Sequence, residues 1–126
     1  MKDIVNILIV DDEPDVVEIL RYNLVKENYN VFKAYNGIEA LDMAIDKLPD
    51  LIIMDIRMPG LTGIETCRKM RLIDSLKNTP ILFLTADSDE YTTMNAFEAG
   101  ASHFITKPIR PAILLEMINE LIKQKH

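Results

Sequence analysis

Three aspartates, one threonine and one lysine stand out in this sequence because each comes directly after an apolar stretch of strand length. They are Asp11 and Asp12, Asp55, Thr85, and Lys107. Carboxylates that lie close together repel each other, and their oxygens suit a hard divalent ion such as Mg²⁺. If the fold brings these residues together, Asp55 could attack phosphorus and form an aspartyl phosphate, while the cations and the hydroxyl hold the phosphoryl oxygens.

Each of these residues also has a purely structural interpretation when it is taken singly. The first two acids could cap a helix that begins near Pro14, and Asp55 could start the turn that contains Pro59-Gly60. The threonine hydroxyl could bond to the backbone, and the lysine could be an ordinary surface residue. The choice between the two interpretations depends on whether the fold places the five residues at neighbouring strand ends.

Composition limits the class of protein. The chain has 126 residues, of which 48% are hydrophobic and 27% charged, and we expect a single domain over residues 1–126. No apolar run is long enough to span a membrane, and no signal peptide is predicted. The single cysteine, Cys67, cannot form an internal disulfide, which favours a cytoplasmic location. The formal charge of -6 argues against nucleic-acid binding by this domain.

Apolar stretches alternate with amphipathic segments along the whole sequence. Strands are predicted at residues 6–10, 31–34, 51–54, 81–84 and 103–106. Helices are predicted at about 15–26, 37–45, 62–72, 89–99 and 111–123. A βα unit repeated about five times predicts an α/β fold, a doubly wound flavodoxin-like sandwich with a parallel sheet of strand order 2-1-3-4-5.

This strand order predicts a common crevice for the chemically interesting residues. The carboxyl ends of strands 1, 3, 4 and 5 line the crevice beside the switch point, whereas strand 2 lies at an edge and ends without a charge. The five residues should therefore converge. We expect Asp12 and a backbone carbonyl to bind Mg²⁺ (or Mn²⁺), Lys107 to act as a point charge, and the Thr85 hydroxyl to hold a phosphoryl oxygen.

Four motifs in this order resemble the response regulator receiver domain of two-component signal transduction, in the CheY-like superfamily. They are Ile7-Leu8-Ile9-Val10-Asp11-Asp12-Glu13-Pro14, Asp55-Ile56-Arg57-Met58-Pro59-Gly60, Leu84-Thr85-Ala86 and Phe104-Ile105-Thr106-Lys107-Pro108. The resemblance implies that Asp55 is the phosphoacceptor and that Asp11 and Asp12 serve Mg²⁺, Asp11 through water. It further implies the backbone carbonyl of Arg57 as a metal ligand. Lys107 would contact the phosphoryl group and precede a cis peptide bond.

The same resemblance implies the partners and the output of a phosphorelay. The donor would be a phosphohistidine on a sensor histidine kinase or phosphotransfer protein, which should meet the first helix and the loop after residue 106. Thr85 and Phe104 would form a switch pair. The switched face, built by the fourth helix, fifth strand and fifth helix, would bind a downstream protein or the chain's own output domain. It could also form a homodimer.

Further residues flank the expected site. They are Arg57, Ala86, Asp87 and Pro108. Arg57 and Asp87 lie two residues beyond Asp55 and Thr85, and we expect them to approach each other and obstruct the water that hydrolyses the acyl phosphate. Ala86 is small, so it leaves room for the phosphoryl group.

Several alternatives remain open. The chain could be the N-terminal receiver fragment of a larger response regulator such as a DNA-binding transcription factor, or a receiver that works as an unphosphorylated interaction module. An Mg²⁺ phosphatase with an aspartate nucleophile would need an acid at the position of Arg57. A flavin-binding electron carrier would need a phosphate-binding loop after the first strand. Asp11-Asp12 occupy that position and would repel phosphate. We therefore expect no enzyme beyond a receiver that catalyses its own phosphorylation and dephosphorylation.

Overall fold

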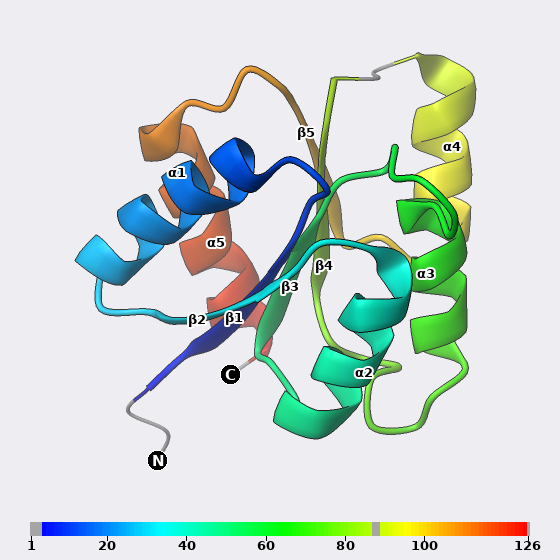
Figure 1. The fold of residues 1–126 in the computed structure, drawn as a ribbon, viewed down its shortest axis with the longest axis horizontal. Coiled ribbons are helices and arrows are strands. Elements are labelled where there is room, and N and C mark those ends of the chain that lie inside the picture. Colours follow the sequence, from blue (N-terminus) through cyan, green and yellow to red (C-terminus); the bar gives the residue numbers. More distant parts are fainter. Residues whose placement is uncertain (1–3, 87–88, 126) are drawn as a thin grey trace.

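The computed structural model describes residues 4–86 and 89–125, in which strands and helices alternate as predicted (Figure 1). The strands are β1 (Asn6–Val10), β2 (Asn30–Ala34), β3 (Leu51–Met54), β4 (Ile81–Thr85) and β5 (His103–Thr106). The helices are α1 (Pro14–Lys26), α2 (Gly37–Lys47), α3 (Gly63–Arg71), α4 (Glu90–Glu98) and α5 (Pro111–Lys125). Every predicted element is present, with ends that differ by a few residues.

The strands form one parallel sheet in the order β2-β1-β3-β4-β5, which confirms the predicted fold class. Val10 pairs with Ala34 on one side and with Met54 on the other. Strands β1 and β3 therefore end level with each other. Because the chain leaves both strands at the same edge of the sheet, the residues that follow Val10 and Met54 come out side by side.

Helices cover both faces of the sheet (Figure 1). Helices α1 and α5 pack on one face around Leu20 and Ile118, and α2, α3 and α4 pack on the other around Ala44 and Met70. All four residues of β3 are buried, because their side chains point alternately into these two cores. A strand covered on both faces has an unbroken apolar sequence, and this explains the stretch before Asp55.

Local signals fix where the loops end and the helices begin at the carboxyl edge of the sheet. A capping box joins Thr62 to Glu65 at the start of α3, with the Thr62 hydroxyl accepting the Glu65 N–H and the Glu65 carboxylate accepting the Thr62 N–H. Asn36 caps α2 in a similar way, and Asp89 caps α4. Gly100 ends the α4 segment at a φ of +112°, as the sequence predicts for this position.

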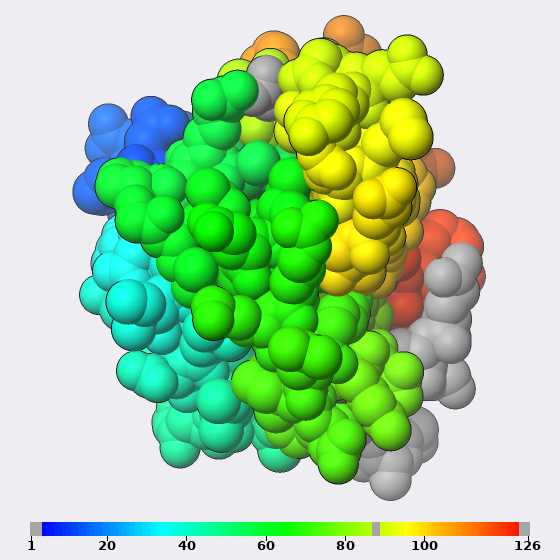
Figure 2. Space-filling view, turned by 90° about the vertical axis from the view of Figure 1, so that its right-hand side faces the viewer, coloured from blue at the N-terminus to red at the C-terminus, as the bar shows by residue number. Residues whose placement is uncertain are grey.

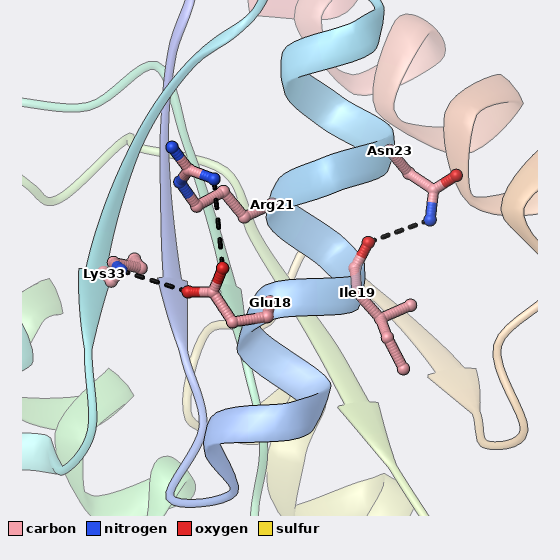
Figure 3. Close-up of polar contacts among 5 residues, drawn as sticks. All are labelled: Glu18, Ile19, Arg21, Asn23 and Lys33. Atoms are coloured by element: carbon pink, nitrogen blue, oxygen red, sulfur yellow. Dashed lines mark hydrogen bonds and ion pairs between the residues drawn. The ribbon is translucent and has the colours of Figure 1, made fainter.

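Figures 2 and 3 show parts of the two helical layers, which lie on opposite faces of the sheet. Figure 2 shows the face covered by α2, α3 and α4, which lie next to one another. On the opposite layer, α1 reaches β2 through an ion pair of 3.1 Å between Glu18 and Lys33, and Arg21 lies 3.8 Å from the same carboxylate (Figure 3). These groups are exposed, so the pairs contribute little to stability.

In the part of the chain that the structure describes, no helix combines the length and the apolar character that a bilayer span requires.

Candidate functional site

Three carboxylates meet at the carboxyl edge of the sheet. One oxygen from each of Asp11, Asp12 and Asp55 lies within 4.8 Å of the others. Asp11 and Asp55 are almost fully buried, and Asp12 is half-buried. The Asp55 N–H donates to the Val10 carbonyl at 2.9 Å, and the Asp11 Oδ1 accepts the Glu13 N–H at 3.0 Å. Both buried acids are therefore fixed by the backbone that carries them.

Lys107 places a cation between the two buried acids. Its Nζ lies 3.0 Å from Asp11 Oδ2 and 3.9 Å from Asp55 Oδ2. Its backbone N–H donates to the Thr85 carbonyl at 2.7 Å, which ties the end of β5 to the end of β4. The peptide bond between Lys107 and Pro108 is cis, as the family resemblance implies.

The pKa of Asp55 is raised to about 6. Burial is the main cause of the increase, and the charge of Asp11 adds to it. The charge of Lys107 lowers the pKa, and so do hydrogen bonds from the backbone N–H groups of Ile56 and Arg57. The nearby charge and the hydrogen bonds therefore offset the effect of burial on the pKa of Asp55 only in part.

The donor set at this site fits a hard divalent cation. Three carboxylates lie together, and the group contains no cysteine or histidine. Oxygen donors of this kind suit Mg²⁺ or Mn²⁺. A bound dication would also favour the ionised form of the Asp55 carboxyl, whose pKa burial raises.

Thr85 and Phe104 lie on neighbouring strands and point to the same face of the sheet. Phe104 pairs with Phe83, and Thr85 follows Phe83 by two residues, so all three side chains project toward the layer of α2, α3 and α4. Thr85 is fully buried, whereas Phe104 is half-buried against the core of that layer. The Phe104 N–H donates to Nδ1 of His103 at 2.8 Å.

The flanking residues predicted from the sequence are only partly placed. Arg57, Ala86 and Pro108 are exposed, and Asp87 lies outside the described residues. The pKa of Asp89 is lowered by hydrogen bonds from Thr92 and further by the charge of Arg57. Arg57 therefore lies near the start of α4, and its predicted approach to Asp87 stays a prediction.

Two features of the site were not predicted from the sequence. The amides of Ile56 and Arg57 bond to the Asp55 carboxylate, so the segment after β3 folds back around its own acid. Gly63 donates its N–H to the Ile56 carbonyl at 2.8 Å and thereby connects α3 to that segment. The Thr62 and Glu65 spacing signals the start of a helix but not the backbone that this start contacts.

The chain also matches known proteins over most of its length. The model of the response regulator receiver domain family matches residues 7–119. The transcriptional regulatory protein ResD of Bacillus subtilis (strain 168) is 40% identical over 118 residues, which are 94% of this chain and 48% of ResD. The chain thus spans about half the length of that relative.

Solved structures agree with this match. The chemotaxis protein CheY4 of Vibrio cholerae has a TM-score of 0.90 at 31% identity, covering 94% of this chain and 98% of that one. The signal receiver domain of a signal transduction histidine kinase from Syntrophus aciditrophicus has a TM-score of 0.88 at 34% identity, covering 95% and 91%. The parallel sheet, the family match and these relatives together show that the chain belongs to the response regulator receiver domain family.

Proposed function

We propose that this receiver takes a phosphoryl group on Asp55, from a phosphohistidine of a sensor histidine kinase or phosphotransfer protein, or from a small phosphodonor. The observation that carries the proposal is the cluster of Asp11, Asp12 and Asp55 with Lys107 Nζ 3.0 Å and 3.9 Å from two of its carboxylates. The cluster combines a nucleophilic oxygen with a nearby cation.

The proposed transfer forms one bond and breaks one. A carboxylate oxygen of Asp55 bonds to phosphorus, and the bond from phosphorus to the donor's imidazole nitrogen breaks, with its electron pair leaving on that nitrogen. The product is an acyl phosphate, which water later hydrolyses. Lys107 stabilises the phosphoryl oxygens by its charge, and because it already lies beside Asp55 it needs little reorganisation. The chain thus catalyses only its own phosphorylation and dephosphorylation.

Mg²⁺ (or Mn²⁺) completes the proposed site. Asp12, Asp55 and the backbone carbonyl of Arg57 would hold the ion, and Asp11 would act through water. When bound, the ion supplies positive charge to the phosphoryl oxygens. Removal of the ion should therefore prevent phosphorylation while leaving the fold intact.

The proposed switch couples Thr85 to the face of α4, β5 and α5. When the Thr85 hydroxyl turns to bond a phosphoryl oxygen, the half-buried ring of Phe104 can move into the space that it leaves. A difference of a few kcal/mol between the interactions of the two conformations is enough to change which of them predominates. The face already exposes Tyr91, Met94 and Ile113, which a downstream protein, an output domain of the same polypeptide or a second copy could bind.

The kinase or phosphotransfer protein would meet the side of the site formed by α1 and the loop at 107–109. Ile19 and Tyr22 of α1 are exposed. Figure 3 shows Ile19 and Asn23 on the side of α1 turned away from the Glu18 contact with β2. Helix α1 follows Asp11 and Asp12 at the carboxyl edge, and its exposed apolar side chains suit a transient protein contact. Such signalling partners imply a cytoplasmic location, and we propose no nucleic-acid binding by this domain.

Incubation with acetyl phosphate and Mg²⁺ tests the proposed function. We expect intact mass spectrometry to show a gain of one phosphoryl group in the wild type, no gain with EDTA, and no gain in Asp55→Asn. Asp50→Asn is the matched control, because Asp50 is equally buried but lies before β3, where its Oδ2 accepts the Asn6 N–H. An unmodified wild type, or a phosphorylated Asp55→Asn, would refute the proposal.

Thr85→Val should separate phosphorylation from switching. The variant keeps a buried side chain of similar shape but removes a hydroxyl whose bond to a charged phosphoryl oxygen is worth about 1.5–3 kcal/mol. We expect Asp55 to accept phosphate still, while the change in hydrogen exchange of peptides from α4 and β5 on phosphorylation becomes much smaller. Thr79→Val, which removes a buried hydroxyl elsewhere, should keep that change. An unaltered response in Thr85→Val would contradict the coupling.

A further inference from the structure

Helix α3 begins directly against the backbone of the proposed phosphoacceptor. Its first residue, Gly63, donates its N–H to the Ile56 carbonyl at 2.8 Å. A Cβ atom at this position would overlap the Asp55 carbonyl oxygen and would lie 2.9 Å from the Ile56 Cα. Both atoms belong to the main chain, so a bulkier residue could not be accommodated by rotating a flexible side chain away. Only glycine allows this approach.

The backbone that Gly63 contacts also forms the other side of the site. The N–H groups of Ile56 and Arg57 bond to the Asp55 carboxylate, and the Arg57 carbonyl is the metal ligand of the proposed function. The segment 55–57 therefore has α3 behind it and the reactive carboxylate in front of it. A displacement of the segment from behind would move the carboxylate and the carbonyl together, without changing any group that could bind the ion.

Neither of the two segments that meet at this contact, the start of α3 and the backbone at 55–57, can easily move away from the other. The capping box of Thr62 and Glu65 fixes the first turn of α3, and the buried Thr66 donates its hydroxyl to the Thr62 carbonyl at 2.7 Å. On the other side, Ile56 and Met58 are each only 6% exposed within the core of the α2, α3 and α4 layer. Interiors this closely packed resist the shift that a single added methyl group would require.

We infer that Gly63 is a positioning residue for the phosphorylation site: its close contact with the main chain of Asp55 and Ile56 holds the carboxylate and the Arg57 carbonyl where they bind Mg²⁺. The inference rests on the proposed function, since it assigns a task to the same site. Gly63 touches neither the ion nor the phosphoryl group, and it acts through the segment 55–57.

Gly63→Ala tests the inference through metal affinity rather than through activity alone. Supporting groups behind a metal site typically change affinity by about 10-fold or more when they are altered. We therefore expect the Kd of the unphosphorylated protein for Mg²⁺, measured by isothermal titration calorimetry, to rise about 10-fold. The Mg²⁺ concentration for half-maximal phosphorylation by acetyl phosphate should rise in parallel, and both are measured where circular dichroism shows a folded protein.

Gly37→Ala is the matched control. Gly37 is also buried at the first position of a helix, and a Cβ there would be equally crowded, but by the side chains of Thr66 and Leu61. A general loss of packing should therefore lower the thermal stability of both variants, while the Kd for Mg²⁺ rises clearly more in Gly63→Ala than in Gly37→Ala. Equal Mg²⁺ affinities in wild type and Gly63→Ala, or an equal loss in Gly37→Ala, would overturn the inference.

A second variant covers the case in which Gly63→Ala does not fold. Thr62→Ala removes the cap that fixes the start of α3 but adds no atom near Asp55. The Kd of Thr62→Ala for Mg²⁺ should rise, by a smaller factor than that of Gly63→Ala. An unchanged Kd would contradict the positioning role of Gly63. A wild type that binds no Mg²⁺ and gains no phosphoryl group would instead refute the proposed function.

Discussion

Replacing Lys107 by alanine is expected to slow phosphorylation of Asp55 by about 100-fold, the usual cost of removing one preorganised group that stabilises transition-state charge. The lysine Nζ lies 3.0 Å from the Asp11 carboxylate and 3.9 Å from the Asp55 carboxylate. Without it, phosphoryl oxygens would approach carboxylates that lack this counter-charge. The initial rate with acetyl phosphate at fixed Mg²⁺, followed by intact mass, measures the effect.

The same substitution should also destabilise the metal-free protein at neutral pH. Breaking a buried ion pair by removing one partner costs about 3–5 kcal/mol, and partial exposure of the lysine reduces the expected loss to about 1–3 kcal/mol. Lys33→Ala is the matched control, because it breaks an exposed pair of nearly the same length with Glu18. It should change neither rate nor stability appreciably. If Lys107→Ala is phosphorylated as fast as Lys33→Ala, the role of Lys107 in stabilising the phosphoryl oxygens is contradicted.

Asp55→Asn is expected to stabilise the metal-free protein above pH 6. The pKa of Asp55 is raised from 3.8 to about 6 in the folded state. A raised pKa means that folding favours the neutral form, so its contribution to stability is complete below about pH 4 and is lost as the pH rises through about 6. A shift of this size corresponds to about 3 kcal/mol, which solvent screening reduces to about 1–2 kcal/mol.

Urea denaturation in EDTA, followed by circular dichroism at pH 4 and at pH 7.5, measures this difference. The two proteins should have similar unfolding free energies at pH 4, whereas Asp55→Asn should be the more stable at pH 7.5. Asp89→Asn is the opposite control: hydrogen bonds from Thr92 lower the pKa of Asp89, so its contribution is present at neutral pH and disappears on acidification. A variant Asp55→Asn that is no more stable than wild type at pH 7.5 would contradict the prediction.

The expected stabilisation by Asp55→Asn means that the charged Asp55 carboxylate destabilises the metal-free wild type. Mg²⁺ should reverse the order, because a ligand that binds only the folded state raises its stability by mass action. The buried Asp55 carboxylate thus lowers the stability of the metal-free protein at neutral pH, at a site where it can bind a cation. Sites of phosphoryl transfer commonly accept such a local electrostatic cost.

Most of the architecture could be predicted from the sequence because it follows from local rules. Apolar stretches of strand length, amphipathic segments and turn residues locate every element, and the handedness of parallel crossovers leaves few strand orders. The left-handed Gly100 after α4 follows from the same rules. All five helices differ from the predicted ranges by one or two residues at one end or both, because helix ends fray and local patterns do not define them more closely.

The sequence by itself determined which residues converge, because strand ends in a parallel sheet of known order must meet at one edge. Only the tertiary structure decided how they interact: that Lys107 lies closer to Asp11 than to Asp55, and that burial raises the pKa of Asp55. It also decided that Gly63 packs against the Asp55 backbone. These features depend on distances of a few ångströms between segments far apart in the chain, and local patterns carry no information about them.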